Sequence, residues 1–128
     1  MKPGMRIGQE ETIQFTVTKE MFAEFGGQVV HPAYSTAWMV YHMEWASRKL
    51  ILHFLEDTEE GMGAEVTVKH LAPGLEGEAV TVTATLTSIE GNAIVAEVKA
   101  YGPDGLIGTG EVKQKILPKV KISSILKS

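Results

Sequence analysis

The sequence contains no cysteine, and it has no apolar run of the length that crosses a membrane. Without cysteine, disulfide bridges, thiolate catalysis and cysteine-based zinc sites are all excluded. A spanning helix needs about 18 consecutive apolar residues, and the opening stretch MKPGMRIGQEE lacks the apolar core of an export signal. We therefore expect a cytoplasmic protein with no membrane partner.

An excess of positive charge is also lacking. The chain has 12 lysines and arginines against 16 acidic residues, a formal net charge of −4. Because affinity for nucleic acid comes mainly from basic residues that neutralise phosphates, we expect no nucleic-acid partner. Lysines do gather near the C-terminus, at Lys113, Lys115, Lys119, Lys121 and Lys127. We interpret them as a solvated edge strand and tail, and the alternative is a contact with a polyanionic small ligand.

Motifs for a metal or a resident cofactor are missing as well. The four histidines, at positions 31, 42, 53 and 70, do not have the spacing of metal ligands. The glycines form no phosphate-binding loop, since Gly61-Met62-Gly63-Ala64 precedes a predicted strand and not a helix. We predict neither a metal nor a bound cofactor.

A long apolar helix is the most prominent feature that is present. The chain of 128 residues, 44% hydrophobic and 22% charged, predicts one globular domain over residues 1–128. A helix is predicted for residues 36–55, with Ser35 or Thr36 capping its free amides. Its apolar residues fall on nearly every face, so we expect other elements to wrap it.

Residues on either side of this helix alternate as strands do. Strands are predicted over residues 12–18, 62–72, 79–89, 93–101 and 106–117, a short helix over 19–24 and a loop over 28–33. Gly108 and Gly110 in the last strand indicate a bulge or a close backbone approach. The predicted fold is α+β: an antiparallel sheet of about five strands around one long central helix.

One carboxylate, Glu44, interrupts the apolar helix. An ionised carboxylate in apolar surroundings costs several kcal/mol unless it is paired or hydrogen-bonded, so a buried one indicates a functional role. The alternative is an exposed carboxylate on a narrow wet stripe, which it shares with Arg48 one turn further along.

Two further polar residues stand out. His70 ends the predicted inner face of strand 62–72, after Ala64, Val66 and Val68. On its own, a histidine at the end of an apolar face is more often a satisfied core residue than a catalytic one. Thr36 begins the helix, where its hydroxyl is either a simple cap or a functional group beside the free amides of the first turn.

The stretches TAWMVYHMEWA (36–46) and GAEVTVKH (63–70) together resemble the fluoroacetyl-CoA thioesterase-like family of hotdog thioesterases. The resemblance covers essentially the whole chain and implies a hotdog fold, in which an antiparallel sheet rolls round a central helix. It implies a catalytic set of Thr36, Glu44 and His70. It also implies substrate contacts from Gly63, and we add Ala37 and Trp38 to the predicted binding residues.

The sequence departs from the family on the last strand. Family members often carry a His-x-Arg motif there, whereas the aligned positions are Val112 and Gln114. The lid phenylalanines of the specialised enzyme are also not evident. We therefore predict a relative that acts on another acyl group.

The predicted function is hydrolysis of a small or medium acyl-CoA thioester. Glu44 would act as base or nucleophile, Thr36 would stand at the helix N-terminus, and His70 would relay a proton. Eight helical residues advance about 12 Å, so Thr36 and Glu44 of one chain cannot touch. The family resemblance and this distance predict a site shared within a homodimer or a dimer of dimers. The alternatives are a noncatalytic acyl-CoA or fatty-acid binding module and a hotdog hydratase or dehydratase.

Overall fold

The computed structural model describes residues 1–127 and contains seven strands, two α-helices and one 3₁₀ helix. In chain order these are β1 (Glu10–Thr16), the 3₁₀ helix (Lys19–Met21), β2 (Phe22–Phe25), β3 (Gln28–Tyr34), α1 (Thr36–Leu52), β4 (Glu59–His70), β5 (Ala79–Glu90), β6 (Ala93–Gly102), β7 (Gly105–Pro118) and α2 (Lys119–Lys127).

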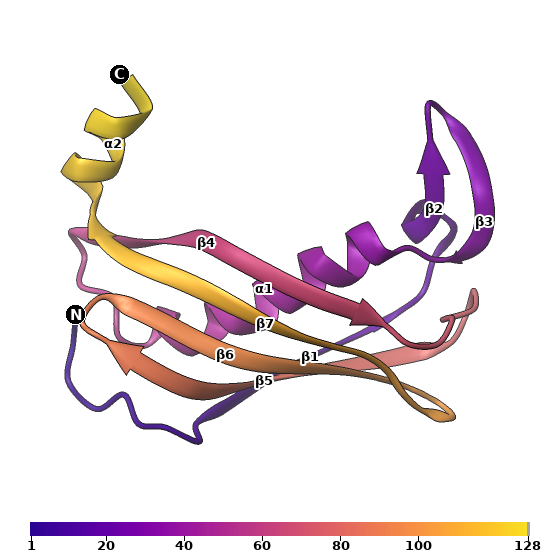
Figure 1. Ribbon diagram of the computed structural model, residues 1–128, viewed down its shortest axis with the longest axis horizontal. Coiled ribbons are helices and arrows are strands. Elements are labelled where there is room, and N and C mark those ends of the chain that lie inside the picture. The colour runs from indigo at the N-terminus through magenta and orange to yellow at the C-terminus, as the bar shows by residue number, and fades with distance from the viewer. Residues whose placement is uncertain (128) are drawn as a thin grey trace.

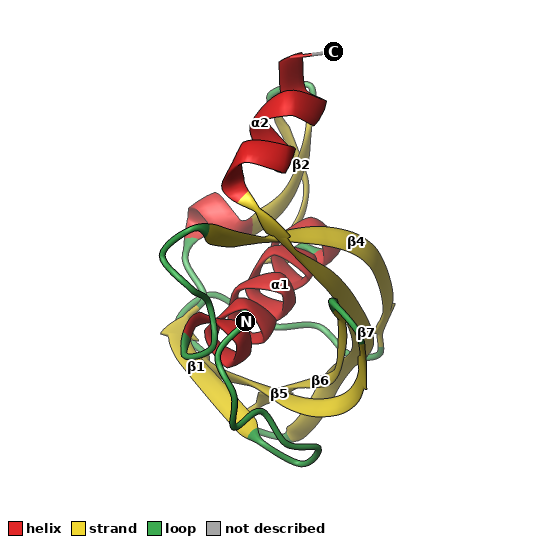
Figure 2. Ribbon diagram, turned by 90° about the vertical axis from the view of Figure 1, so that its left-hand side faces the viewer, coloured by secondary structure: helices red, strands yellow, loops and turns green. Residues whose placement is uncertain are grey.

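A five-stranded sheet in the order β1-β5-β6-β7-β4 forms the body of the molecule. Every neighbouring pair in it is antiparallel. Figures 1 and 2 show this sheet curling around α1, with β1 and β4 as its two edges. The predicted α+β class and the hotdog arrangement of a rolled sheet around one long helix are confirmed.

The core lies between the inner face of the sheet and α1. Alternation along β5 and β6 buries every second residue, because successive side chains of a strand point to opposite faces. The buried set includes Val80, Val82, Ala84, Leu86, Ile94, Ala96, Val98 and Ala100. Met39, Met43 and Ala46 of α1 are fully buried in the same cluster.

Two glycines in β7 allow the helix and the neighbouring strand to come close. A Cβ on Gly110 would lie 2.5 Å from the backbone oxygen of Thr67, and one on Gly108 would overlap with the sulfur of Met39. The ladder from β6 to β7 shifts its register directly beside Gly108, because Ala100 pairs with Gly108 while Tyr101 pairs with Leu106. Both predicted explanations are therefore confirmed: close approach at the two glycines and a bulge next to Gly108.

The predictions for the segment before α1 are partly wrong. Residues 28–33 form part of strand β3 and not a loop, and the helix expected over 19–24 is limited to one 3₁₀ turn. β2 and β3 pair in a hairpin whose turn is Gly26-Gly27, with positive φ angles of 59° and 82° that glycine adopts without strain. This hairpin stands apart from the rolled sheet at one end of α1 (Figure 1).

Helix α1 is wrapped on one side only. Tyr41, Trp45 and Leu52 are about half exposed, and the acidic side chain of Glu44 is exposed with them. The expectation that the whole helix is enclosed is therefore wrong for the single chain. Among the helices that the structure describes, none is long and apolar enough to cross a membrane.

Candidate active site

Thr36 and His70 meet at one end of α1. The Thr36 hydroxyl lies 2.8 Å from Nδ1 of His70, although one residue begins the helix and the other ends strand β4. A hydroxyl in hydrogen-bond contact with an imidazole is the arrangement in which a base activates an oxygen nucleophile or moves a proton. Two of the three predicted catalytic residues are therefore brought together within one chain.

Ser35, and not Thr36, caps the helix. Its hydroxyl oxygen accepts a hydrogen bond from the Trp38 amide at 3.1 Å, and its backbone is extended, as a capping residue requires. The Thr36 hydroxyl is consequently available to His70. Because an α-helix leaves its first amides without intrahelical partners, the N–H groups of Thr36 and Ala37 face outward at this end.

The surroundings of His70 favour the neutral imidazole. Burial lowers the pKa of His70, and the nearby backbone of Ala72 opposes that effect. Its second nitrogen, Nε2, is buried and meets no hydrogen-bond partner in the described part of the chain. The histidine lines a hollow of about 490 Å³ with Thr36, Tyr34 and the hairpin residue His31.

Tyr34 and His42 form a buried pair next to this end of the helix. The Tyr34 hydroxyl lies 2.7 Å from Nδ1 of His42, and the His42 ring stacks on Phe15 with centroids 3.7 Å apart. Burial lowers the pKa of His42 to about 4 and raises that of the Tyr34 phenol. The edge of Tyr34 in turn faces the ring of His70, with centroids 6.2 Å apart.

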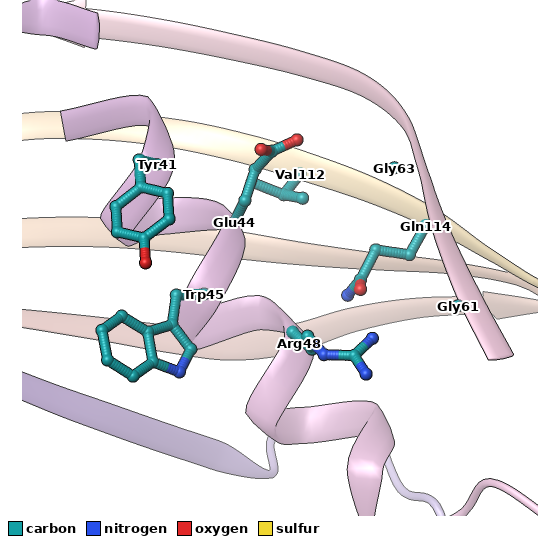
Figure 3. A pocket seen from close by; sticks show the side chains of 8 residues that line it. All are labelled: Tyr41, Glu44, Trp45, Arg48, Gly61, Gly63, Val112 and Gln114. Atoms are coloured by element: carbon teal, nitrogen blue, oxygen red, sulfur yellow. The ribbon is translucent and has the colours of Figure 1, made fainter. Parts of the chain in front are cut away.

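Glu44 is not buried in the single chain, so that prediction is wrong. Its side chain is exposed on the open side of α1, where Tyr41 and Trp45 flank it. The apolar composition of the helix did not reveal which face the sheet leaves uncovered. Glu44 nevertheless lines a second hollow, of about 390 Å³, between α1 and strands β4 and β7 (Figure 3).

Gly63 lies directly beside this carboxylate. A Cβ at Gly63 would come within 3.0 Å of Oε1 of Glu44, closer than ordinary van der Waals contact. The absent side chain therefore leaves room for the acid to lie against β4. Gly63 and Glu44 both line the second hollow.

Two polar residues that sequence reasoning gave no catalytic role, Arg48 and Gln114, also line this hollow. Arg48 donates two hydrogen bonds to Glu60, at 2.7 and 3.1 Å, and these hold the pKa of Glu60 below its ordinary value. Gln114 is 6% exposed and extends from β7 toward α1 (Figure 3). Its inward alternation with Val112 and Ile116 was the one signal available in the sequence.

The remaining predicted binding residues lie elsewhere. Trp38 is half buried and packs against Tyr41 and His42, and it lines neither hollow. Ala37 is exposed in the first turn of α1 and contributes its backbone to that end. Across residues 1–127, no group of three or more potential metal ligands gathers.

The two hollows lie along one helix but do not merge. Thr36 and His70 line one of them, while Glu44 lines the other, and the structure shows no contact between the acid and the pair. Eight residues of α-helix separate Thr36 from Glu44 by about 12 Å along the axis. The predicted catalytic set is therefore divided into a pair and a separate acid.

A family model described as fluoroacetyl-CoA-specific thioesterase matches residues 17–120. The chain belongs to the fluoroacetyl-CoA thioesterase family. A fluoroacetyl-CoA thioesterase from Streptantibioticus cattleyicolor is 32% identical over 130 residues, which cover 97% of this chain and 94% of that protein. The family is one of thioester hydrolases, so the predicted enzyme class is confirmed.

Solved structures agree with membership in this family. A thioesterase superfamily member from Thermus thermophilus superposes with a TM-score of 0.95 at 46% identity, covering 99% of this chain and 93% of that one. A variant of the fluoroacetyl-CoA-specific thioesterase in complex with fluoroacetate and CoA has a TM-score of 0.85 at 31% identity, over 92% of this chain and 99% of that one. The site residues of this chain remain predictions.

Proposed function

We propose that this protein hydrolyses a small or medium acyl-CoA thioester to the carboxylic acid and free CoA. The observation that carries the proposal is the hydrogen bond between Thr36 and His70 beside the open N-terminus of α1. Membership in the thioesterase family supports the reaction class. The size of the acyl group and the roles of the individual site residues belong to the same proposal.

The N-terminus of α1 is suited to bind the thioester carbonyl. The free amides of Thr36 and Ala37, aided by the positive end of the helix dipole, can donate hydrogen bonds to the oxygen as negative charge develops on it. Ala37 would then fulfil its predicted role in substrate binding through its backbone N–H group. The hollow beside His70 then accommodates the groups on either side of the carbonyl carbon.

We propose that Glu44 reaches this carbonyl from a second copy of the chain. Tyr41 and Trp45 leave about half of their surface exposed beside Glu44, and the outer edge of β4 is unpaired where residues Gly63 and Glu65 are exposed. Exposed aromatic groups and a free strand edge are features that oligomers cover. A homodimer that covers them would place the Glu44 hollow of one protomer against the Thr36–His70 pair of the other.

The chemistry then needs no external reagent beyond water. Glu44 takes a proton from water, whose oxygen bonds to the carbonyl carbon while the helix amides stabilise the oxyanion. The carbon–sulfur bond then breaks, and a proton relayed through His70 and Thr36 neutralises the CoA sulfur. In the alternative route, the Glu44 carboxylate bonds to the carbonyl carbon itself, the carbon–sulfur bond breaks so that CoA leaves and takes the relayed proton, and water hydrolyses the resulting anhydride.

Release of free thiol from a panel of acyl-CoAs of increasing chain length tests the activity. We expect turnover by the wild-type protein and its loss in Glu44→Gln. Saturable acyl-CoA binding without thiol release would show that the protein is a noncatalytic binding module and not an enzyme.

Mixing two inactive variants tests the shared site. Glu44→Gln chains combined with His70→Ala chains, under conditions where subunits exchange, should regain about a quarter of the wild-type activity at equal ratio, because half of the chains pair as mixed dimers with one intact site. A mixture that stays inactive although mixed dimers are detected would show that each chain carries a complete site. A wild-type protein that is active as a monomer would show the same.

A further inference from the structure

We propose that the hollow beside Glu44 binds an acyl group that carries a neutral hydrogen-bonding substituent, a hydroxyl or a keto oxygen, and that Gln114 recognises it. This inference rests on the proposed thioesterase function and narrows its substrate class. The observation behind it is a largely buried glutamine whose amide has no hydrogen-bond partner in the described chain and faces the hollow.

Gln114 is the anomaly in the inner face of β7. Its neighbours on that face, Val112 and Ile116, are apolar and buried, and Gln114 itself is only 6% exposed. Neither its amide nitrogen nor its amide oxygen has a hydrogen-bond partner within residues 1–127, and the amide opens onto the hollow that Gln114 lines. A glutamine held among apolar neighbours with a free amide facing a hollow can bind a polar group of a ligand there.

The amide is directed into a space of the right kind. Figure 3 shows the Gln114 side chain reaching from β7 toward α1, with its amide on the side of Arg48. The hollow that it lines holds about 390 Å³ and also contains Glu44. That volume is near the lower end for ligand pockets, so only a short chain fits beyond the carboxylate.

The charges in the hollow favour a neutral substituent over an anionic one. Both terminal nitrogens of Arg48 that face this region are engaged by Glu60, at 2.7 and 3.1 Å. The guanidinium is therefore compensated, while the acidic Glu44 adds negative charge. An acyl chain ending in a second carboxylate would meet no free cation among the described lining residues.

The Gln114 amide is suited to bind a neutral hydroxyl or keto substituent. Its N–H₂ group donates to a keto or hydroxyl oxygen, and its oxygen accepts from a hydroxyl. The apolar side chain of Val112 and the aromatic face of Trp45 line the rest of the hollow and contact the carbon chain. A site built to hydrogen-bond a substrate group rejects the analogue that lacks it, because its own polar group is then left unpaired.

Matched pairs of short acyl-CoAs test the inference. Thiol release is measured for straight-chain acyl-CoAs and for their hydroxy, keto and carboxy counterparts of the same chain length. We expect kcat/KM for at least one hydroxy or keto compound to exceed that of its unsubstituted partner by about tenfold, the value of one additional hydrogen bond at such a site. The carboxy compounds should be the poorest substrates.

The variant Gln114→Leu should abolish that preference, so that each polar compound and its unsubstituted partner give similar kcat/KM values. Gln14→Leu makes the same chemical change on exposed strand β1, where Gln14 contacts Thr81, and should leave the preference intact. Thermal unfolding of each variant checks that the fold is retained. A wild-type preference that persists in Gln114→Leu would overturn the proposal, and so would a wild-type enzyme without any preference for the polar compounds.

Binding separates this inference from the proposed catalysis. Calorimetry with nonhydrolysable thioether analogues of the same pairs measures selectivity without turnover. Selective binding that depends on Gln114, in a protein that releases no thiol, would support the subsite and reject the thioesterase. Hydrolysis without selectivity in either assay would reject the subsite and retain the thioesterase.

Discussion

The Thr36 hydroxyl and Nδ1 of His70 lie 2.8 Å apart across 34 residues of sequence. The contact exists because Ser35 caps α1, which leaves the next hydroxyl unused, and because β4 ends beside the start of the helix. The Thr36–His70 contact is therefore formed within a single chain.

Replacing the Thr36 hydroxyl should disable the proposed relay. Thr36→Val keeps the side-chain shape and removes the oxygen, and we expect kcat/KM for acyl-CoA hydrolysis to fall by about 10²–10⁴-fold. Thr36→Ser restores the oxygen and should retain most of the activity. The matched control is Thr12→Val, which removes an exposed hydroxyl that contacts Thr83 on the outer side of the sheet. Equal activity of Thr36→Val and wild type would exclude the hydroxyl from the reaction.

Adding one methyl group at Gly63 should displace the acid. An alanine Cβ there would lie 3.0 Å from Oε1 of Glu44, so the carboxylate must move by a few tenths of an ångström. Because a displacement of about 1 Å can cost 10²-fold in rate, we expect Gly63→Ala to lower kcat by about tenfold with Tm nearly unchanged. Ala64→Ser, on the adjacent exposed residue of β4, serves as the control and should leave both values unaltered.

Isotope labelling should identify the role of Glu44. In a single turnover in ¹⁸O-labelled water, a general base leaves its own carboxylate unlabelled and the label enters the product acid directly. A nucleophile forms an anhydride with the acyl group, and attack of water on the Glu44 carbonyl of that anhydride leaves one labelled oxygen in Glu44. Mass spectrometry of the peptide that contains Glu44 measures the result. We expect no label there, and its appearance would establish the covalent route.

The stability of the fold should fall as the pH drops below neutrality. Burial lowers the folded-state pKa of His42 from 6.5 to about 4, so between these values the unfolded chain binds more protons than the folded one. The stability that neutral His42 contributes to the fold is fully present above about pH 6.5. It is lost as the pH falls toward 4, which lowers the free energy of unfolding by up to roughly 3 kcal/mol. The lowered pKa of His70 acts in the same direction. Glu59 and Glu60, whose pKa values are also lowered, add their losses below about pH 4.5.

Urea unfolding across that pH range measures the effect. The double variant His42→Leu with Tyr34→Phe replaces both partners of the buried hydrogen bond, so neither group is left unsatisfied. It should show a flatter pH dependence than wild type. His53→Gln removes an exposed histidine that pairs with Glu11 and should keep the wild-type slope. An unchanged slope in the double variant would show that His42 does not control acid stability.

Two glycines of β7 should differ in how much they tolerate alanine. A Cβ on Gly110 meets the backbone oxygen of Thr67, which the β4–β7 ladder fixes in place, whereas one on Gly108 meets the flexible thioether of Met39. Overpacking a core costs about 1–3 kcal/mol. We expect Gly110→Ala to reach the upper end of that range and Gly108→Ala the lower end. Denaturant unfolding compares them, and Gly108→Ala proving the more damaging would contradict this account.

The alternating strands were predictable because burial follows a period of two. Val80 to Leu86 and Ile94 to Ala100 occupy the inward positions that their spacing predicts. Strand β3 was missed because His31 and Pro32 resemble loop residues, and only its pairing with β2 shows it to be a strand. Most of β3 is exposed, so its sequence lacks the alternation of apolar and polar residues that makes long strands predictable.

The candidate site was predicted less completely than the fold. The pairing of Thr36 with His70 followed from the family resemblance, since no local spacing relates a helix start to a strand end. Glu44 was expected to be buried because large apolar side chains, Tyr41 and Trp45, stand beside it on the face that the sheet leaves uncovered. Gln114 was noted only as a departure from a motif, because its lack of a partner is visible only in three dimensions.

The separation of the two hollows along α1 has an evolutionary consequence. Replacements at the Gln114 end can alter which acyl chain is accepted, while the residues that hold Thr36 against His70 lie on other segments and need not be repacked. Relatives can thus differ in the acyl group that they accept while they keep the same Thr36–His70 pair. Changes confined to the last strand would then be enough to alter the substrate preference of this fold.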